Sequence, residues 1–591
     1  MCGLCGELRF DSQGPDPEVI KKMLPKLARR GPDFEGTWQH ESVQFGHRRL
    51  AIIDLSERSN QPMHDAPLGL TLVFNGTIYN YPELRKRFID EGYHFQSEGD
   101  TEVILKAYHK WGEQCPAHLD GMFAFAIWDN NKKQMFIARD RMGIKPFYFS
   151  QTGHYFRFAS NPQALIATGQ EDTSIDKVGL HHQFTLHAVI PAPHTILNGI
   201  KKLEPGTSMT IQTNREVSSH RYWRLMATRP TEKYTDQEWI ARIHQQLRDA
   251  VQKRKMVADV PVGVLLSGGL DSSLLVALLA EAGVNDLLTF SIGFEDQPEE
   301  KGSEFEFSDQ IVERYQTQHH KIHIPNDQVL KRLPEAVEYM AEPMFGQDAV
   351  AFFLLSEQVS QQVKVVQSGQ GADEVFAGYF WYQKMVQDIN GDYTDRFARY
   401  YFDREHAEYL QTVADKYHGD DYTRQKIDSL LNEPAADEFI DRILRLDVTT
   451  LVVDDPVKRV DNMTMAFGLE ARVPFLDSRL VELAAQMPPH MKLGSDGKHV
   501  LKAISRGILP DAVIDRPKGY FPMPALKYVR DDFLNFMRDI LLSETARQRG
   551  LYQPAYVEKL LSEPDQHFTR LQGSKLWHLA LLELWLQTHL S

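Results

Sequence analysis

One segment of the chain, residues 262–283, constrains the fold more than any other. An apolar strand is expected from Val262 to Leu266 and a buried helix from Ser272 to Ala282, with a Ser/Gly-rich loop between them. A short apolar strand that leads through such a loop into a helix is the repeating unit of parallel, doubly wound sheets. The segment therefore predicts an α/β domain.

The loop of this segment has the composition of a phosphate site. Its glycines allow backbone N–H groups to approach an anion, its hydroxyls add donors, and the helix N-terminus adds partial positive charge. The loop reads Ser267-Gly268-Gly269-Leu270-Asp271-Ser272-Ser273, without the Gly-Lys-Ser/Thr of a Walker loop. A merely tight strand-to-helix turn is the alternative.

Two further loops follow apolar strands of the same region. Ser291-Ile292-Gly293-Phe294 ends the stretch 287–292, and Ser368-Gly369-Gln370-Gly371-Ala372-Asp373-Glu374 follows 363–367. In an open parallel sheet such loops meet at the carboxyl edge, where ligands bind. Asp271 and Asp373 are then candidate ligands for Mg²⁺, which prefers carboxylate oxygens.

The first part of the chain has a different sequence pattern. Short apolar runs separated by turn residues predict an antiparallel, mostly β region, with helices over 81–91 and 100–111, and hence an α+β sandwich. A polar connection over 205–232 separates it from the α/β region, and beyond about residue 375 the pattern becomes mainly helical. We expect two domains, residues 1–215 and 216–591.

Composition excludes several classes of protein. The chain has 591 residues, a net charge of −15 and no run of 18 apolar residues. The absence of a basic surplus argues against nucleic-acid and anionic-membrane partners, and the N-terminus lacks the features of an export signal. We expect a cytoplasmic enzyme with small-molecule partners; the sequence does not determine the oligomeric state, and a homodimer is one option.

Cys2 is the most reactive candidate, because removal of Met1 would give one residue both a thiol and a free α-amine. An α-amine titrates at about pH 8 and a thiol at about 8.5, so the amine can act as the base for the nucleophile. Three cysteines, Cys2, Cys5 and Cys115, do not form a disulfide framework. A zinc or redox half-site at Cys2-x-x-Cys5 is the less favoured interpretation, because no second pair accompanies it.

Three other side chains fit an amide-hydrolysing site around Cys2. Asn75 and Gly76, expected to follow a strand over 70–74, have donors suited to a tetrahedral oxyanion. Arg49 is suited to a substrate carboxylate, and Asp100 to a substrate ammonium group. Each has a structural alternative: a hairpin turn for Asn75-Gly76, a surface charge for Arg49, and a helix N-cap for Asp100.

The segments Arg30-Gly31-Pro32-Asp33, His47 to Leu50 and Asn75 to Asn80 follow Cys2 in an order that resembles the class II glutamine amidotransferases. The resemblance covers about the first 200 residues and implies an N-terminal nucleophile hydrolase sandwich (αββα). It implies Cys2 as nucleophile, Asn75 and Gly76 as the oxyanion hole, and glutamine ligands at Arg49, Ile53, Asn75, Gly76, Thr77 and Asp100.

One position departs from this family. Glutamine amidotransferases usually have Glu after Asn-Gly, where its carboxylate helps to hold the glutamine α-ammonium, and this chain has Thr77. Asp100 is then the one obvious anionic partner. We expect weaker glutamine binding but retained hydrolysis, and a lower KM for glutamine in Thr77→Glu.

The loop 267–273 resembles the pyrophosphate-binding loop of N-type ATP pyrophosphatases, and Gly468 to Asp477 resembles the helical part of asparagine synthetases. The resemblance implies ATP and Mg²⁺ as cofactors, with Asp271 and Asp373 as metal ligands. It also implies Gln370 and Lys498 as catalytic residues, Lys498 stabilising charge; a solvated surface lysine is the alternative. The implied ATP ligands are Leu266, Ser267, Gly268, Gly269, Asp271, Ser272, Ser273, Ile292, Ser368 and Gly369.

Together the two halves imply a carbon–nitrogen ligase. A small carboxylate acceptor attacks the α-phosphorus of ATP, pyrophosphate leaves, and ammonia from glutamine displaces AMP to form an amide. Ammonia must travel in a dry passage, because in water it becomes ammonium, which has no lone pair for attack.

The acceptor is inferred from positions at which this chain departs from the asparagine synthetase pattern. Asparagine synthetases read Ser-Gly-Glu where this chain has Gln370, and Glu342–Asp348 lacks the usual Asp-Pro-Ser. With Thr77 and the segment 184–193, these resemble the N-acetylglutaminylglutamine amidotransferase branch, which makes a bacterial osmolyte. Asparagine synthetase acting on aspartate is the alternative, and a non-catalytic, nucleotide-binding stress protein is a second one.

Overall fold

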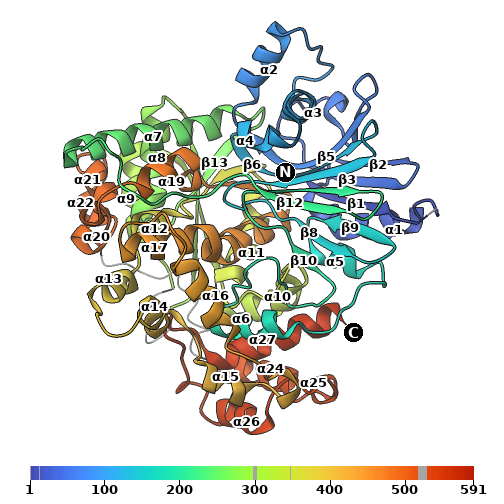
Figure 1. Ribbon diagram of the computed structural model, residues 1–591. Helices are drawn as coiled ribbons and strands as arrows, with labels where there is room; N and C mark the ends of the chain where they lie inside the picture. Colours follow the sequence, from blue (N-terminus) through green and yellow to red (C-terminus); the bar gives the residue numbers. More distant parts are fainter. Residues whose placement is uncertain (1, 12, 297–301, 347, 517–528, 591) are drawn as a thin grey trace.

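The structure is a computed structural model, and it describes residues 2–11, 13–296, 302–346, 348–516 and 529–590. Two antiparallel sheets form its N-terminal part, at the right of Figure 1. The first sheet has the order β10 (Lys201–Lys202), β8 (Tyr148–Gln151), β9 (Tyr155–Ala159), β1 (Gly3–Arg9), β3 (Val43–Arg49) and β2 (Phe34–His40). The second has the order β12 (Val217–Arg221), β11 (Thr207–Gln212), β7 (Gln134–Arg139), β6 (Gly121–Asp129), β5 (Leu70–Ile78) and β4 (Met63–Asp65).

The two sheets pack face to face, because alternate strand residues on their inner faces are apolar. Leu4 and Phe45 of the first sheet and Val73 and Ala124 of the second belong to one buried cluster. Helices cover the outer faces: α1 (Pro17–Met23) and α5 (Pro162–Ile166) on the first sheet, and α2 (Tyr81–Asp90), α3 (Asp100–Trp111) and α4 (Cys115–His118) on the second. Helix α6 (Lys177–Thr185) packs instead against α15 (His406–Thr412) and α16 (Tyr422–Leu431) of the second part of the chain.

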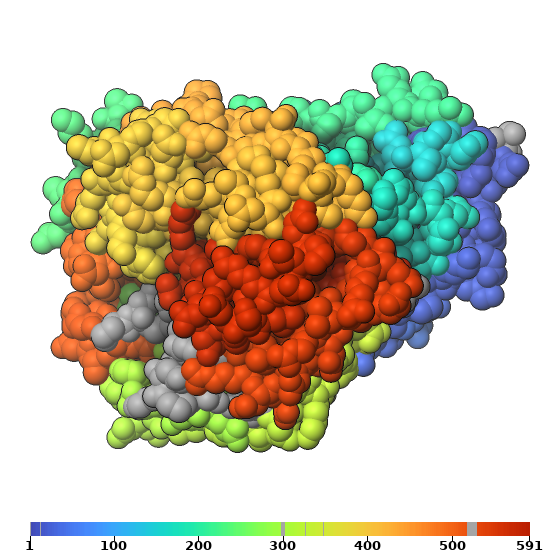
Figure 2. All heavy atoms as spheres, turned by 90° about the horizontal axis from the view of Figure 1, so that it is seen from below, coloured from blue at the N-terminus to red at the C-terminus, as the bar shows by residue number. Residues whose placement is uncertain are grey.

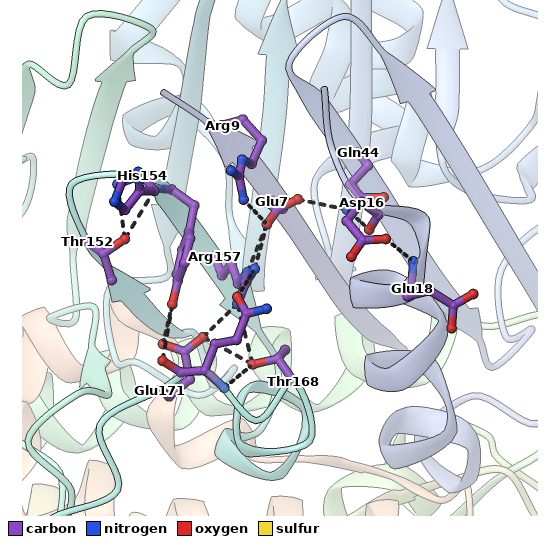
Figure 3. A network of polar contacts seen from close by, with 12 residues as sticks. Glu7, Arg9, Asp16, Glu18, Gln44, Thr152, His154, Arg157, Thr168 and Glu171 are labelled. Atoms are coloured by element: carbon purple, nitrogen blue, oxygen red, sulfur yellow. Dashed lines mark hydrogen bonds and ion pairs between the residues drawn. The ribbon is translucent and has the colours of Figure 1, made fainter. Parts of the chain in front are cut away.

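A buried ion pair stabilises the first sheet beneath these helices (Figure 3). Glu7 on β1 accepts hydrogen bonds from Nε and Nη2 of Arg157 on β9 at 2.9 and 2.8 Å. Both side chains are fully buried. Gln44 on β3 donates to the second Glu7 carboxylate oxygen at 2.9 Å, and Glu171 adds a second carboxylate for Arg157. The pair is thus part of a satisfied network.

Arg157→Met is expected to destabilise this domain by about 3–5 kcal/mol, because it leaves a buried carboxylate uncompensated. Urea unfolding followed by tryptophan fluorescence measures the loss. The double variant Glu7→Leu/Arg157→Met should recover much of the stability, and Arg506→Met, which breaks an exposed pair, should change it little. Equal losses for Arg157→Met and Arg506→Met would contradict the expectation.

A parallel sheet organises the second part of the chain. Its order is β15 (Gln318–Ile324), β14 (Leu288–Phe294), β13 (Val262–Leu265), β16 (Val365–Gln367) and β17 (Glu470–Arg472), and every pair is parallel. One face packs on α7 (Asp236–Met256), α8 (Leu270–Glu281), α9 (Phe305–Tyr315), α19 (Ser478–Ala485) and α21 (His499–Ser505). The other packs on α10 (Asn326–Glu338), α11 (Asp348–Val359), α18 (Lys458–Met465) and α27 (Lys575–His589). The doubly wound arrangement predicted for this region is present.

Further helices complete the chain, as the pattern beyond residue 375 predicts. In the view from below, the red C-terminal residues lie against the yellow and orange residues that precede them, while blue N-terminal residues lie at the right edge (Figure 2). The additional helices are α12 (Ala372–Phe376), α13 (Phe380–Gln387), α14 (Tyr393–Tyr401), α15 (His406–Thr412), α16 (Tyr422–Leu431), α17 (Phe439–Leu446), α20 (Pro489–Leu493), α22 (Asp511–Ile514), α24 (Asp531–Leu541), α25 (Glu544–Arg549) and α26 (Pro554–Ser562).

Three boundaries differ from the sequence-based expectations. Strand β5 continues to Ile78 through its pairing with β6, so Asn75-Gly76 lies inside a strand and is not a turn after it. Helix α8 begins at Leu270, so Asp271 is in its first turn. Residue 215, the predicted domain boundary, falls between β11 and β12 of one sheet, and we propose a boundary between Arg221 and Asp236 instead.

In the portion of the chain that the structure describes, no helix combines the length and apolar character needed to cross a membrane.

Candidate active sites

Cys2 lies immediately before β1 and is buried, with 7% of its surface exposed. Its backbone N–H donates to Oδ1 of Asn75 at 3.0 Å, and its carbonyl accepts from Nε of Arg30 at 3.3 Å. Burial raises the pKa of the Cys2 thiol. The thiol is therefore protonated at neutral pH, and its attack on an amide needs a nearby base. Removal of Met1 would create that base, the α-amine, on the same residue.

Asn75 contacts Cys2 from strand β5, and Gly76 follows it in the same strand. The Asn75 side chain is fully buried, and its Nδ2 has no hydrogen-bond partner among the described residues. An unsatisfied buried donor costs about 1–3 kcal/mol, so this amide is poised to bind an acceptor such as an oxyanion. Gly76 has φ 153°, and a Cβ there would lie 2.1 Å from the carbonyl oxygen of Met122. No other residue type fits this position.

Arg49 holds the loop that follows β3. Its Nη1 donates to the Ser56 carbonyl and to Oδ1 of Asn60 at 2.8 and 2.7 Å. Its Nη2 donates to the carbonyls of Ile53 and Asp54 at 3.4 and 2.5 Å. A substrate carboxylate gripped by both Nη atoms would have to replace these acceptors. Arg49 and Ile53 are thus brought together as predicted for neighbouring ligands, and their role in glutamine binding stays a prediction.

Asp100 is the first residue of α3, and Gly99 is the N-cap, so the helix-capping alternative for Asp100 is wrong. The Asp100 carboxylate instead accepts the backbone N–H of Ile78 at 2.9 Å, which places it against the end of β5. Burial, with the negative charge of Glu470, raises the pKa of Asp100 to about 6, although the Ile78 N–H acts in the opposite direction. The negative charge of Asp100 in turn raises the pKa of the Cys2 thiol and that of Tyr81.

This pKa predicts an acid limit for glutamine use. Only ionised Asp100 attracts an ammonium group, so kcat/KM for glutamine hydrolysis should fall below pH of about 6. Because the protonation of one carboxylate is involved, kcat/KM should fall by about tenfold per pH unit. The midpoint of the fall should reflect the pKa in the free enzyme, which is what kcat/KM reports. A pH series of glutaminase activity measures it. Asp100→Asn should lower kcat/KM and flatten this limb, whereas an unchanged limb in that variant would assign it to another group.

The second part of the chain closes this site through α18 and β17. Asp461 accepts from Nη1 of Arg30 at 2.9 Å and from Nζ of Lys145 at 3.1 Å, and all three side chains are at most 8% exposed. Thr77 Oγ donates to the Glu470 carboxylate, 3.3 and 3.4 Å from its two oxygens. Arg30 thereby connects the Cys2 carbonyl to the α/β part of the molecule.

A second site lies at the carboxyl edge of the parallel sheet. Ser272 Oγ lies 3.1 Å from Ser267 Oγ and accepts the N–H of Ser267 at 3.2 Å, which folds the loop back on the start of α8. Gly268 has φ 74°, and a Cβ there would lie 2.7 Å from the backbone nitrogen of Ser308. Ser273 is buried, with an Oγ that has no partner among the described residues. The loop is compact, as a phosphate site requires.

Lys498 joins the two acidic loops of this edge. Its Nζ lies 2.7 Å from Asp271 Oδ2 and 2.8 Å from Asp373 Oδ1, and only 11% of the Lys498 side chain is exposed. Burial acts to lower the pKa of Lys498, but Asp271 and Asp373 outweigh it and raise this pKa. Lys498 is thus a permanent cation, and the surface-lysine alternative is wrong. Two carboxylates that share one ammonium also have the donor chemistry that Mg²⁺ takes.

The remaining predicted ligands surround this cluster. Leu266 donates its N–H to Phe290 at 2.8 Å, and Ile292 lies farther along the same strand, β14. Ser368 donates its N–H to Arg472 at 2.9 Å, and a Cβ on Gly369 would lie 3.1 Å from Cβ of Asp271. Gln370 is partly buried in the turn before α12. The loops 267–273 and 368–374 therefore meet, as their positions after parallel strands predict. Ser291-Ile292-Gly293-Phe294 is not a loop after a strand as predicted, because the pairing with β15 continues through Phe294 and keeps all four residues within β14.

Sequence reasoning missed several residues that connect the sites. Arg30 and Glu470 lie in quoted motifs, but no role was predicted for their side chains, and Lys145 was not considered. The missing carboxylate at residue 77 was the signal that another acidic residue, here Glu470, could lie at this position. All three cysteines are free and buried; Cys5 donates its thiol to the Gly46 carbonyl at 3.6 Å.

Comparison with known families agrees with this division of the molecule. The family model described as asparagine synthase matches residues 242–587, and the glutamine amidotransferase domain model matches residues 1–223.

Individual relatives match over most of their length. Asparagine synthetase 3 (glutamine-hydrolyzing) of Bacillus subtilis is 30% identical over 100% of this chain and 99% of its own. Asparagine synthetase 1 of the same organism is 30% identical over 99% of this chain and 96% of its own. Asparagine synthetase B of Escherichia coli is 28% identical over 88% of this chain and 82% of its own.

Proposed function

This chain belongs to the asparagine synthase family of glutamine-dependent carbon–nitrogen ligases, and from that premise we propose that it adenylates N-acetylglutaminylglutamine and amidates it with ammonia from glutamine. The observation that carries the two-step mechanism is the pairing of a buried Cys2–Asn75 site with a converged Asp271–Asp373–Lys498 cluster in one chain.

In the first half of the reaction, the Cys2 sulfur attacks the side-chain amide carbon of glutamine. The α-amine of processed Cys2 takes the thiol proton and returns a proton to the departing ammonia, which leaves a thioester that water hydrolyses to glutamate. The unpartnered Nδ2 of Asn75 stabilises the oxyanion. Arg49 and Asp100 hold the amino-acid end of glutamine, the carboxylate and the ammonium respectively.

In the second half, an acceptor carboxylate oxygen attacks the α-phosphorus of ATP, and pyrophosphate leaves. The loop 267–273 binds the phosphates, and Asp271 and Asp373 would hold Mg²⁺, which neutralises phosphate charge when bound. Lys498, fixed between the same two carboxylates, faces the developing charge. Ammonia then attacks the acyl carbon and AMP departs with the bonding electrons.

Joining the halves keeps ammonia unprotonated. The interface between the two domains contains two sets of buried contacts: those of Arg30 and Lys145 with Asp461, and that of Thr77 with Glu470. Such a buried interface excludes water between the domains. This supports direct transfer of ammonia from one site to the other within one cytoplasmic enzyme.

The acceptor is proposed from two segments that depart from the asparagine synthetase pattern, 184–193 and 342–348, and that pack together. Gln183, directly before the segment 184–193, donates to the Pro343 carbonyl at 3.0 Å, and the rings of Phe184 and Phe345 lie 5.8 Å apart. Within the same segment, His187 contacts Asp403 at 2.8 Å. Because both segments differ from the aspartate-using pattern and contact each other, a changed acceptor explains them jointly. Gln370 removes one negative charge beside the acceptor, which suits a substrate other than aspartate.

The test measures pyrophosphate release with ATP, glutamine and either N-acetylglutaminylglutamine or aspartate. We expect release, with AMP and amide in equal amounts, from the dipeptide. Turnover with aspartate alone would establish the second candidate, which the names of the relatives favour. The absence of both glutaminase activity and ATP–pyrophosphate exchange would favour a non-catalytic, nucleotide-binding protein.

A further inference from the structure

The residue after Asn75-Gly76 contacts a carboxylate that comes from a distant part of the sequence. Thr77 donates its hydroxyl to Glu470 on β17, a residue of the parallel sheet. Both side chains are buried, Thr77 to 1% exposure and Glu470 to 0%. A carboxylate therefore lies beside position 77 even though residue 77 itself has none.

Glu470 is ionised in this position. Burial acts to raise its pKa, but the positive charges of Arg472 and Lys145 help to lower the pKa to about 2. Nε of Arg472 contacts one carboxylate oxygen at 2.5 Å, while both oxygens lie within 3.4 Å of the Thr77 hydroxyl. Glu470 thus carries a negative charge in the wall of the glutaminase site.

Asp100, the first residue of α3, contacts the same end of β5. Its carboxylate accepts the N–H of Ile78, the residue directly after Thr77, and the charge of Glu470 acts on it. The two carboxylates therefore contact neighbouring residues of β5, Thr77 and Ile78, and Asp100 also acts on the Cys2 thiol. A substrate ammonium placed in the region between them is attracted by both and relieves their mutual repulsion.

We propose that Glu470 replaces the carboxylate missing at residue 77, so that the glutamine α-ammonium is held between Asp100 and Glu470, one from each part of the molecule. This assignment rests on the proposed glutaminase activity of Cys2. It makes Glu470 a specificity-determining residue and makes glutamine binding dependent on the docked parallel-sheet domain.

The proposal reverses the expectation for Thr77→Glu. With Glu470 in contact, a carboxylate at residue 77 would meet a buried like charge, which is destabilising. Thr77→Glu should therefore weaken glutamine binding and not strengthen it. Adding Glu470→Gln to that variant removes the repulsion and returns one carboxylate to the region.

The experiment measures glutamine hydrolysis by the full-length enzyme and, separately, amide synthesis from ammonium chloride. Glu470→Gln should raise KM for glutamine about ten- to a hundredfold, the effect expected for losing a charged partner. It should leave ammonium-driven synthesis within about twofold, and should shift the acid limb of kcat/KM below the pH of about 6 set by Asp100. Thr77→Glu should also raise KM, and the double variant should recover most of the loss.

Controls separate this role from a structural one. Glu583→Gln removes a fully buried, Arg549-paired carboxylate elsewhere, and should change neither KM nor the acid limb. The proposal would be overturned if Glu470→Gln changed neither the KM for glutamine nor the acid limb of kcat/KM. It would also be overturned if Thr77→Glu lowered the KM for glutamine, and this test does not depend on whether Glu470→Gln folds. Equal losses of glutamine-driven and ammonium-driven synthesis would also overturn it. Absence of wild-type glutaminase activity would refute the proposed function itself.

Discussion

Cys2→Ala is expected to lower glutamine-dependent amide formation by about a thousandfold or more, the scale seen when a catalytic nucleophile is removed. The loss should appear in kcat, because the bonds to sulfur form only during reaction. Synthesis from ammonium at high pH should continue, because ammonia then enters without glutamine hydrolysis. Product formation from each nitrogen source, measured side by side, gives both results.

A matched cysteine variant makes this result specific. Cys115 is fully buried in the core beside the second antiparallel sheet and has no role in either site. Cys115→Ala should retain glutamine use, with at most a modest loss of stability from the small cavity. Persistence of glutamine-driven synthesis in Cys2→Ala would remove the basis for a sulfur nucleophile.

The parts of the fold that local patterns specify were predictable. The helix over 100–111 has the bounds expected for it, because its apolar periodicity and its flanking turn residues are local features. The strand–loop–helix at Val262 predicted the parallel sheet, since such a unit buries its apolar surface in few other ways. The meeting of Asp271 and Asp373 followed from strand order alone.

Other features depend on contacts that no local pattern records. Asn-Gly is commonly a turn, but β6 pairs with β5 through Ile78, and this pairing keeps Asn75 within a strand. The partner of Thr77 lies 393 residues away in the sequence, and that of Arg30 lies 431 residues away. Only the docking of the two domains brings these pairs together, so the sequence indicated the missing carboxylate but not its replacement.

These long-range contacts also link the two sites through neighbouring elements of the parallel-sheet domain. Asp461 lies in α18, and Glu470 is the first residue of β17. Strand β17 pairs directly with β16, which leads into the loop of Asp373. A shift of β17 would move the wall of the glutaminase site and the edge of the adenylating site together. The Glu470 side of the Cys2 site and the loop of Asp373 are therefore connected through two adjacent strands, β17 and β16.

Lys498→Met is expected to lower acceptor-dependent ATP–pyrophosphate exchange by about a thousandfold, the magnitude found for single preorganised charges at phosphoryl and oxyanion sites. The variant removes the ammonium that holds Asp271 and Asp373 at 2.7 and 2.8 Å, so the two carboxylates repel each other where ATP phosphates must bind. Radioactive pyrophosphate exchange measures this step without glutamine.

Two comparisons distinguish the charge of Lys498 from its bulk. Lys498→Arg keeps the charge but not the compact ammonium that two carboxylates share, so it should recover only part of the exchange. Lys492→Met removes another buried lysine of the same domain, 3.3 Å from Asp441, and should leave exchange close to wild type if the fold is retained. Glutaminase activity should survive in Lys498→Met, because Cys2 and Asn75 belong to the other domain. Full exchange in Lys498→Met would show that Asp271 and Asp373 bind nucleotide and metal without this cation, and would move the charge-stabilising role to a different residue.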